Sequence, residues 1–397
     1  MCVEKKELLS AVDKISESLK KMRRELHQIP ELAFCEEKTS DYICKKLDDI
    51  GITYKRGIAK TGVVALIEGK NATKTLLLRA DIDALPMQED KSRPGCSLHD
   101  GVMHACGHDA HTAVLLGVAE VLWSLRDSLS CNVKLVFQPG EEDTGGAEPM
   151  ISEGVLENPK VDAALALHVM NEVETGKIRV KPGAVMACPD EFDLKIIGKG
   201  GHGGYPKECV NPIEVASRIV NDFYALSGEV NEPDRPVVIS VCSINGGTFY
   251  NIIPNEVSIR GTVRLYDSKL RKNLPDMLEN IIKENTKHFK AEYEWDYRFM
   301  FPPLINDEKM CEEFSDVCAD VIGNENVIKN GTPSMAGDDF AYFAEKVPSV
   351  YFNLGSGNKE KGVTMPLHAP DFDIDDDCLK TGVLAMCSYA LNFGKLK

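Results

Sequence analysis

Four short stretches of the sequence concentrate side chains that bind divalent metal ions. Cys106 and His108 stand two residues apart, and Gly107 between them lets the backbone bend so that both can face one ion. The other metal-type side chains are Glu141 and Glu142 after Gln-Pro-Gly, His168 after Ala-Leu-Ala-Leu, and His368 in Pro-Leu-His-Ala-Pro. Each stretch alone has an ordinary structural explanation, but their combination in one chain predicts a metal site.

Glu141 and Glu142 suggest a division of labour at that site. Neighbouring side chains in loop backbone point in different directions, so one carboxylate can bind an ion while the other faces a water molecule on it. A metal ion brings the pKa of such a water near neutrality, and a free carboxylate beside it acts as a general base. The pair indicates metal-assisted hydrolysis of an acyl bond, with donors enough for two ions roughly 3.5–4 Å apart.

Apolar periodicity indicates the elements that position these side chains. Short, nearly continuous apolar runs are typical of strands buried on both faces, and they lie at residues 75–80, 132–138 and 163–167. A helical pattern at 109–125 separates the first two, which indicates an α/β domain with a largely parallel sheet. Glu141, Glu142 and His168 follow two of the strands, where parallel sheets build their binding sites.

The pattern changes from residue 189, where alternating apolar and charged residues indicate a sheet with one face in solvent. The elements expected next are a strand near 192–196, a helix at 211–226, strands at 237–244 and 257–265, a helix at 269–289 and a strand at 291–298. This β-α-β-β-α-β order is typical of ferredoxin-like domains. We therefore expect an α/β catalytic domain, residues 1–187 and 300–397, interrupted by a smaller α+β domain, residues 188–299.

Composition excludes several kinds of partner. The chain has 46 Lys+Arg and 62 Asp+Glu, a formal net charge of −16, which repels nucleic acid and anionic membrane surfaces. No apolar stretch approaches the ~20 residues of a spanning helix, and residues 1–24 lack the apolar segment of an export signal. We expect a cytoplasmic protein whose 13 cysteines are reduced.

Eight motifs occur in an order that gives the chain a family resemblance. They are Leu26-His-Gln-Ile-Pro-Glu-Leu32, Arg79-Ala-Asp81-Ile-Asp83-Ala-Leu-Pro86, Met103-His-Ala-Cys-Gly-His-Asp109, Gln138-Pro-Gly-Glu-Glu142, Leu167-His168, Gly200-Gly-His-Gly203, Asn251-Ile-Ile-Pro-Asn255 and Leu367-His368. The chain resembles the amidohydrolase branch of the metal-dependent aminoacylase/carboxypeptidase family. That branch includes hippurate hydrolase, auxin-conjugate hydrolases and N-acetyldiaminopimelate deacetylase.

The resemblance implies a role for each residue of the metal site. The implied ligands of two divalent metal ions are Cys106, in the bridging position, His108, Glu142, His168 and His368. Glu141 is implied as the general base, and Asp81 as the aspartate that fixes a metal-binding histidine. The donor types accept Mn, Zn, Co or Ni.

The resemblance also implies an N-acyl amino acid as substrate, cleaved at its amide to a carboxylate and the free amino acid. His202 is implied to stabilise the developing oxyanion, in some relatives across a dimer, and Asn251 to meet the substrate carboxylate or the scissile carbonyl. The inserted domain is implied to act as a lid and dimerisation domain of a homodimer or higher homo-oligomer. Its closure would exclude water.

Four positions depart from the family pattern without removing a ligand. Ala110 and Gly140 stand where relatives usually carry Gly and Ala, Asp338 stands where Glu is typical, and the lid loop continues with Gly204-Tyr205.

Three alternative functions stay open. One is a metallo-carboxypeptidase or dipeptidase on the same site. Another is a cysteine amidase with Cys106 as nucleophile, which leaves the Glu141-Glu142 pair without a task. The third is a non-catalytic protein that binds metal or acylated amino acids, against which the intact base Glu141 argues.

The remaining histidines are weaker candidates for metal ligands, and one glycine motif is a weak candidate for a dinucleotide site. His104 and His111 flank the Cys-Gly-His core and are rival ligands, whereas His27, His99 and His288 are expected to be structural or on the surface. Residues 198–203 fit the GxGxxG dinucleotide fingerprint, but Tyr205 and Pro206 follow where a helix should begin. That reading is therefore excluded.

Overall fold

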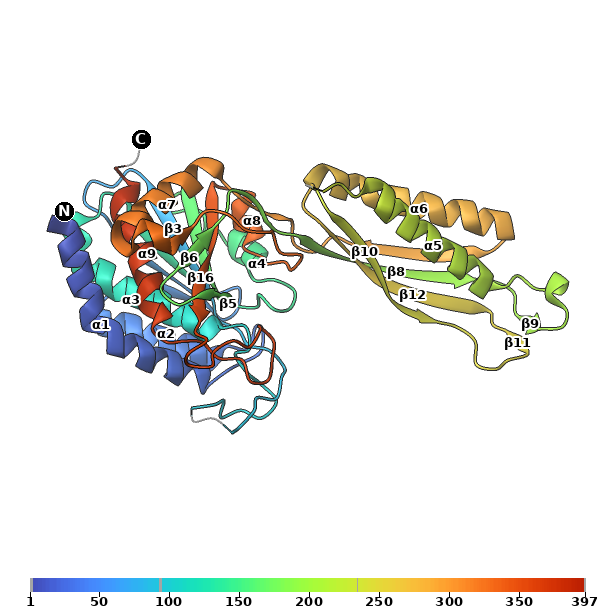
Figure 1. The fold of residues 1–397 in the computed structure, drawn as a ribbon, viewed down its shortest axis with the longest axis horizontal. Helices are drawn as coiled ribbons and strands as arrows, with labels where there is room; N and C mark the ends of the chain where they lie inside the picture. The colour runs from blue at the N-terminus through green and yellow to red at the C-terminus, as the bar shows by residue number, and fades with distance from the viewer. Residues whose placement is uncertain (1–2, 93–94, 234, 396–397) are drawn as a thin grey trace. The chain divides into compact units, whose positions relative to one another are not determined.

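The computed structural model describes residues 3–92, 95–233 and 235–395 (Figure 1). These residues form two compact units. Unit 1 runs to Val185 and resumes over Ile305–Thr332 and from Asp339 onward, whereas unit 2 comprises Met186–Leu304 and Pro333–Asp338. The boundaries of unit 2 lie a few residues outside the expected 188–299, and a short later segment joins it.

Unit 1 is built on an eight-stranded sheet with the strand order β1-β2-β4-β3-β5-β16-β6-β15. The strands span Tyr54–Ile58 (β1), Gly62–Ile67 (β2), Thr75–Asp81 (β3), Asn132–Gln138 (β4), Ala163–Glu174 (β5), Ile178–Val180 (β6), Val327–Ile328 (β15) and Ser349–Gly357 (β16). The four central strands, β4, β3, β5 and β16, run parallel. The expected largely parallel sheet is confirmed.

Helices α1, α3 and α9 of unit 1 pack against one another. The α-helices described in this unit are Val3–His27 (α1), Glu37–Ile50 (α2), His108–Ser124 (α3), Ala147–Ser152 (α4), Glu308–Ile322 (α7), Ala341–Ala344 (α8) and Cys378–Phe393 (α9). Short 3-10 turns lie at Arg126–Ser128 and Asn324–Asn326. Helix α3 is buried along nearly its whole length, because its sequence is apolar on all sides. Its first turn is therefore fixed inside the core.

Unit 2 carries a four-stranded antiparallel sheet with the order β10-β12-β8-β13. Its elements are Cys188–Ile197 (β8), Pro212–Val230 (α5), Val237–Asn245 (β10), Glu256–Leu265 (β12), Ser268–Phe289 (α6) and Glu292–Arg298 (β13). Alternate residues of β8, among them Phe192, Leu194 and Ile196, join the core beneath α5 and α6. The expected β-α-β-β-α-β order of a ferredoxin-like unit is confirmed.

Short elements complete the chain. Unit 2 also holds the antiparallel pair Gly201–His202 (β9) and Ile252–Ile253 (β11), and a 3-10 turn at Pro206–Glu208. Strands Gly183–Met186 (β7) and Leu304–Asn306 (β14) lie where the chain passes from one unit to the other. Across the described residues, every helix is too short or too polar to cross a lipid bilayer.

Candidate metal centre

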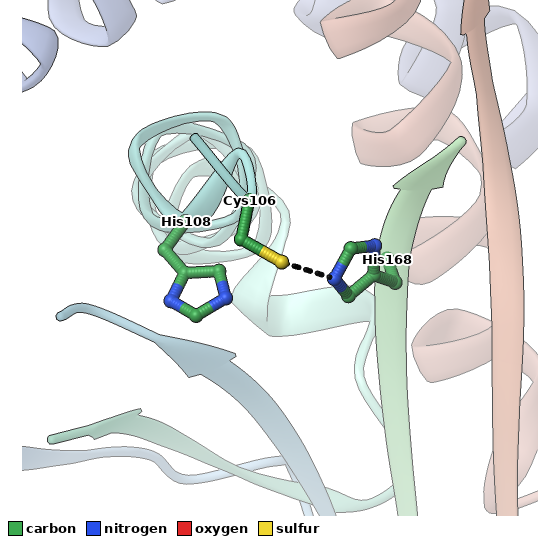
Figure 2. A group of neighbouring side chains, drawn as sticks. All are labelled: Cys106, His108 and His168. Carbon is green, nitrogen blue, oxygen red and sulfur yellow. Dashed lines mark hydrogen bonds between the residues drawn. The ribbon is translucent and has the colours of Figure 1, made fainter. Parts of the chain in front are cut away.

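Cys106 lies between two histidines from distant parts of unit 1. Its Sγ atom is 3.3 Å from His168 Nε2 and 3.3 Å from His368 Nε2. Cys106 lies just before α3, His108 is the first residue of α3, and His168 comes from β5 (Figure 2). Gly107 has φ +85°, and a Cβ there would lie 2.3 Å from a methyl carbon of Val169. Only glycine therefore allows this turn.

The two glutamates after β4 close the group. Glu142 Oε1 lies 3.4 Å from His368 Nε2 and 3.8 Å from His108 Nε2, and Glu141 Oε2 lies 4.0 Å from His108 Nε2. Of the five sets of donor atoms that lie within 4.8 Å of one another, three consist of these side chains: Cys106, His108 and His168; Cys106, Glu142 and His368; and His108, Glu141 and Glu142. The structure thus brings together the five expected ligands and the expected base.

The donor atoms fit divalent metal ions. His168 Nδ1 lies 2.8 Å from the Val169 carbonyl, and His108 Nδ1 lies 3.0 Å from the Asp83 carbonyl, so both rings carry their proton on Nδ1. In its neutral form each ring then presents the Nε2 lone pair to the centre. Among the described residues, His108 Nε2 and Glu142 Oε1 are buried without a hydrogen-bond partner. Buried acceptors of this kind are normally satisfied, and a divalent cation bound here would satisfy them.

Asp83, rather than Asp81, holds His108. The Asp83 carboxylate lies 3.2 Å from His108 Nδ1 through Oδ1 and accepts the backbone N–H of Glu142 through Oδ2 at 2.9 Å. Asp81 Oδ1 lies 3.8 Å from His108 Nδ1 but 2.6 Å from His111 Nδ1. Asp81 therefore orients His111, which is not among the expected ligands. Asp83, to which the sequence analysis gave no role, contacts two expected ligands, His108 and Glu142.

A buried ion-pair network holds the side chain of Asp81 in place. Arg79 donates to Asp81 Oδ2 at 2.6 Å, to Asp339 at 2.9 Å and to Gln138 at 2.9 Å, and its side chain is fully buried. Asp339 also accepts the backbone N–H of Ala147 at 2.8 Å. Removing one partner of such a network leaves an uncompensated buried charge, so these residues fix the ends of β3 and β4 together.

His202 and Asn251 belong to unit 2, whereas the metal-type side chains belong to unit 1. His202 pairs with Ile252 across β9 and β11, and Gly203 donates its N–H to the Asn251 carbonyl at 2.8 Å. His202 is exposed, and its Nδ1 accepts the N–H of Gly204 at 3.0 Å. The ring proton therefore sits on Nε2, which faces away from this bond as a free donor.

Comparison with known proteins places the chain. Residues 77–392 match the model of peptidase family M20/M25/M40. The chain belongs to this family.

Relatives of this M20/M25/M40 chain include enzymes of two kinds. It is 36% identical over 392 residues to thermostable carboxypeptidase 2 of Saccharolobus solfataricus, covering 97% of this chain and 98% of the relative. It is 39% identical over 303 residues to an N-acyl-L-amino acid amidohydrolase of Geobacillus stearothermophilus, covering 76% and 81%. A solved structure of a dinuclear metal-binding M20 peptidase from Bacillus subtilis matches with 30% identity and a TM-score of 0.85, over 96% of this chain and 99% of that one.

Electrostatics in this family member suit ligands rather than a nucleophilic thiol. Burial, with the charge of Glu142 adding to it, raises the pKa of the Cys106 thiol well above its ordinary value. Both nucleophilic attack and metal binding use the thiolate, so this shift argues against a nucleophile that acts unaided, whereas a bound cation would displace the thiol proton. Burial lowers the pKa of His168 to about 4, so its imidazole is neutral near pH 7 and able to bind a metal ion.

His108 carries the opposite shift. Burial opposes its charge, but the Asp81 carboxylate and the bond to Asp83 outweigh burial and hold the pKa of His108 well above its ordinary value. A cation at the centre would compete with that proton, since only the neutral imidazole binds metal.

The other histidines of this family member lie outside the three donor sets. His111 Nε2 accepts the Val169 N–H at 3.0 Å and so has no free lone pair. His104 is buried beside His27 and lies outside the three donor sets. His27 contacts Asp109 at 2.7 Å, His99 contacts the Pro30 carbonyl, and His288 is exposed on α6.

Proposed function

We propose that this chain hydrolyses the amide bond of N-acyl L-amino acids, using two divalent metal ions, and releases a carboxylate and the free amino acid. The observation that carries the proposal is the meeting of five donor side chains with a second, adjacent glutamate at one point of unit 1. Membership of a metallopeptidase family and the likeness to a named N-acyl-L-amino acid amidohydrolase support it.

The residues that would hold the ions are Cys106, His108, Glu142, His168 and His368. Cys106 lies equally close to His168 and His368, which favours the bridging position for its sulfur. Divalent ions held there would polarise the scissile carbonyl and make an attacking water more acidic. Mn, Zn, Co and Ni all accept this mixed donor set, and availability decides among them.

Glu141 is the proposed general base. It is 8% exposed and lies beside the donor group without being needed to complete it. In this role Glu141 accepts a proton from the attacking water and then delivers it to the leaving amine. His202 donates from Nε2 to the developing oxyanion, and Asn251 binds the substrate carboxylate or the scissile carbonyl.

Unit 2 is proposed as the lid and as the surface through which a homodimer or higher homo-oligomer forms. Large apolar side chains are exposed near β9 and β11, among them Tyr205 (63%), Phe249 (55%), Tyr250 (92%) and Ile252 (56%). A patch of this kind favours association with a second copy. A cytoplasmic location is proposed from the cysteines, because the twelve that are described are free thiols.

A metallo-carboxypeptidase is the second candidate function. The same donor group and the same base would cleave a C-terminal peptide bond, and the Saccharolobus relative carries that name. The two candidates differ only in the group on the acyl side of the scissile bond. A substrate panel therefore separates them.

The test measures amine release from N-acetyl and N-benzoyl amino acids and from dipeptides, on metal-free and metal-restored protein. We expect activity on the N-acyl amino acids that disappears with a chelator and returns with Mn or Zn. Activity that resists chelation but is lost on thiol alkylation would overturn the proposal in favour of Cys106 chemistry. Preference for dipeptides would favour the carboxypeptidase.

A further inference from the structure

Glu36 is a buried acid outside the donor group, and it contacts the loop that carries the base. Its side chain is 0% exposed. Glu36 Oε1 accepts the backbone N–H of Gly140 at 3.0 Å, and Oε2 accepts the hydroxyl of Thr61 at 2.5 Å. Gly140 immediately precedes Glu141 in the chain. The carboxyl group is thus tied to the peptide unit that comes one residue before the base.

Phe34 holds the same glycine from another side. Gly140 has φ +69°, and a Cβ built there would lie 2.6 Å from the Phe34 ring. The ring therefore rests on the Gly140 Cα, and Lys60 Nζ lies 4.9 Å from the ring centroid on Phe34. The Gly140 carbonyl in turn accepts the N–H of Gly145 at 3.1 Å. The N–H, the Cα and the carbonyl of Gly140 are thus each held by a different neighbour.

Glu141 lies between two carboxylate anchors. On one side Glu36 accepts the N–H of Gly140, and on the other Asp83 accepts the N–H of Glu142 at 2.9 Å. Asp83 also contacts His108, so its anchor belongs to the metal centre. The Glu36 anchor contacts no donor of the centre among its described hydrogen bonds. Its side-chain hydrogen bonds therefore hold the loop of the base rather than a metal ligand.

We propose that Glu36 and Phe34 are positioning residues for Glu141: by fixing the Gly140 peptide they hold the carboxylate of the base in its working direction. This inference rests on the proposed role of Glu141. Positioning of this kind matters because a displacement of about 1 Å at a catalytic group can cost about 100-fold in rate. Glu36 itself touches neither substrate nor metal.

The test compares Glu36→Leu, which removes the acceptor, with Glu36→Gln, which keeps one. The glutamine carbonyl can accept the Gly140 N–H and its amide can donate to Thr61. We expect Glu36→Leu to lower kcat about 10- to 100-fold with KM and metal content unchanged, and Glu36→Gln to stay within about threefold of the parent. Glu37→Leu is the matched control, because Glu37 is the next residue but is exposed and paired with Arg56.

Hydrogen exchange gives a readout that does not need activity. Glu36→Leu should speed exchange of the Gly140 amide, while Glu36→Gln and Glu37→Leu should not. If the parent protein hydrolyses no substrate, the proposed function fails, but this exchange comparison still tests the anchor. If Glu36→Leu does not fold, Phe34→Ala tests the same element, with faster Gly140 exchange and lower kcat expected.

Three results would overturn the inference. One is unchanged kcat and unchanged Gly140 exchange in Glu36→Leu. Another is loss of metal in proportion to kcat, which would make Glu36 a support of the metal centre. The third is equal damage by Glu36→Gln and Glu36→Leu, which would show that charge, and not the hydrogen bond to Gly140, is what matters.

Discussion

Asp81 Oδ1 lies 2.6 Å from His111 Nδ1, and on its far side His111 accepts the backbone N–H of Val169, the residue after His168. This chain of hydrogen bonds begins at Arg79, which donates to Oδ2, the other carboxylate oxygen of Asp81. A buried guanidinium is in this way connected to the backbone beside an expected metal ligand. His111 supports the centre through its two ring nitrogens without contributing a donor to it.

Replacing His111 by Phe keeps a ring of similar shape but removes both hydrogen bonds. The Val169 N–H is then buried without an acceptor, and His168 loses its fixed backbone. We expect metal affinity to fall about 10- to 100-fold while two ions still bind at saturation. Titration with Mn or Zn followed by metal analysis measures both quantities. A maximum of one bound ion would instead make His111 a ligand.

Substitution of Glu141 and substitution of Glu142 should have different effects on metal content. Glu141→Ala is expected to abolish turnover, a loss of at least about 100- to 10,000-fold, with metal content unchanged. Glu142→Ala is expected to lose metal together with activity, because Glu142 Oε1 faces both His108 and His368. Metal analysis beside the amine-release assay distinguishes them. Loss of metal in Glu141→Ala would contradict this assignment of roles.

His202→Ala should lower kcat about 100- to 1,000-fold, as removal of an oxyanion donor does. Metal content and thermal stability should not change, because His202 is exposed and lies in the unit that lacks the donor group. His288→Ala is the matched control, since His288 is an exposed histidine of the same unit. Equal kcat in the two variants would remove His202 from the reaction.

Glu36 should make stability fall as pH rises. Burial raises the pKa of the Glu36 carboxyl to about 7 against the opposing bond from Thr61, and the nearby Asp83 charge adds to the rise. The unfolded chain releases this proton near its ordinary pKa of 4.5. The stabilisation is therefore complete below about pH 4.5 and is lost as the pH passes through about 7.

Glu36→Gln removes this dependence, because glutamine stays neutral. The free energy of unfolding of the variant relative to the parent should rise between about pH 4.5 and 7, by up to about 1.4 kcal/mol per pH unit. Urea denaturation of both proteins across that range measures the difference. A difference that stays constant with pH would show that the parent carboxyl is already charged throughout.

Strands buried on both faces could be predicted from the sequence alone. The run at 132–138 coincides with β4, and the run at 75–80 falls one residue short of β3. The run at 163–167 ends well before the last residue of β5, Glu174. Residues 170–174 are mostly half-buried or exposed, so they carry no continuous apolar signal. Strand β1 was missed because its central residues, Lys55, Arg56 and Gly57, are exposed at an edge of the sheet.

The donor group could be predicted from residue types and spacing, whereas the residues that hold it in place could not. Asp83 stands in a quoted motif, but nothing in the spacing shows that it, rather than Asp81, faces His108. Glu36 begins a charged stretch with Glu37 and Lys38, which on its own indicates an exposed helix start. Its contact with Gly140 spans 104 residues, so only the folded chain reveals it.

Cys106 and His368 lie 3.3 Å apart although 262 residues separate them in the chain. During synthesis the thiol, His108, Glu142 and His168 all leave the ribosome long before His368 does. The full set of proposed donors can therefore assemble only after the C-terminal part of the chain has been made.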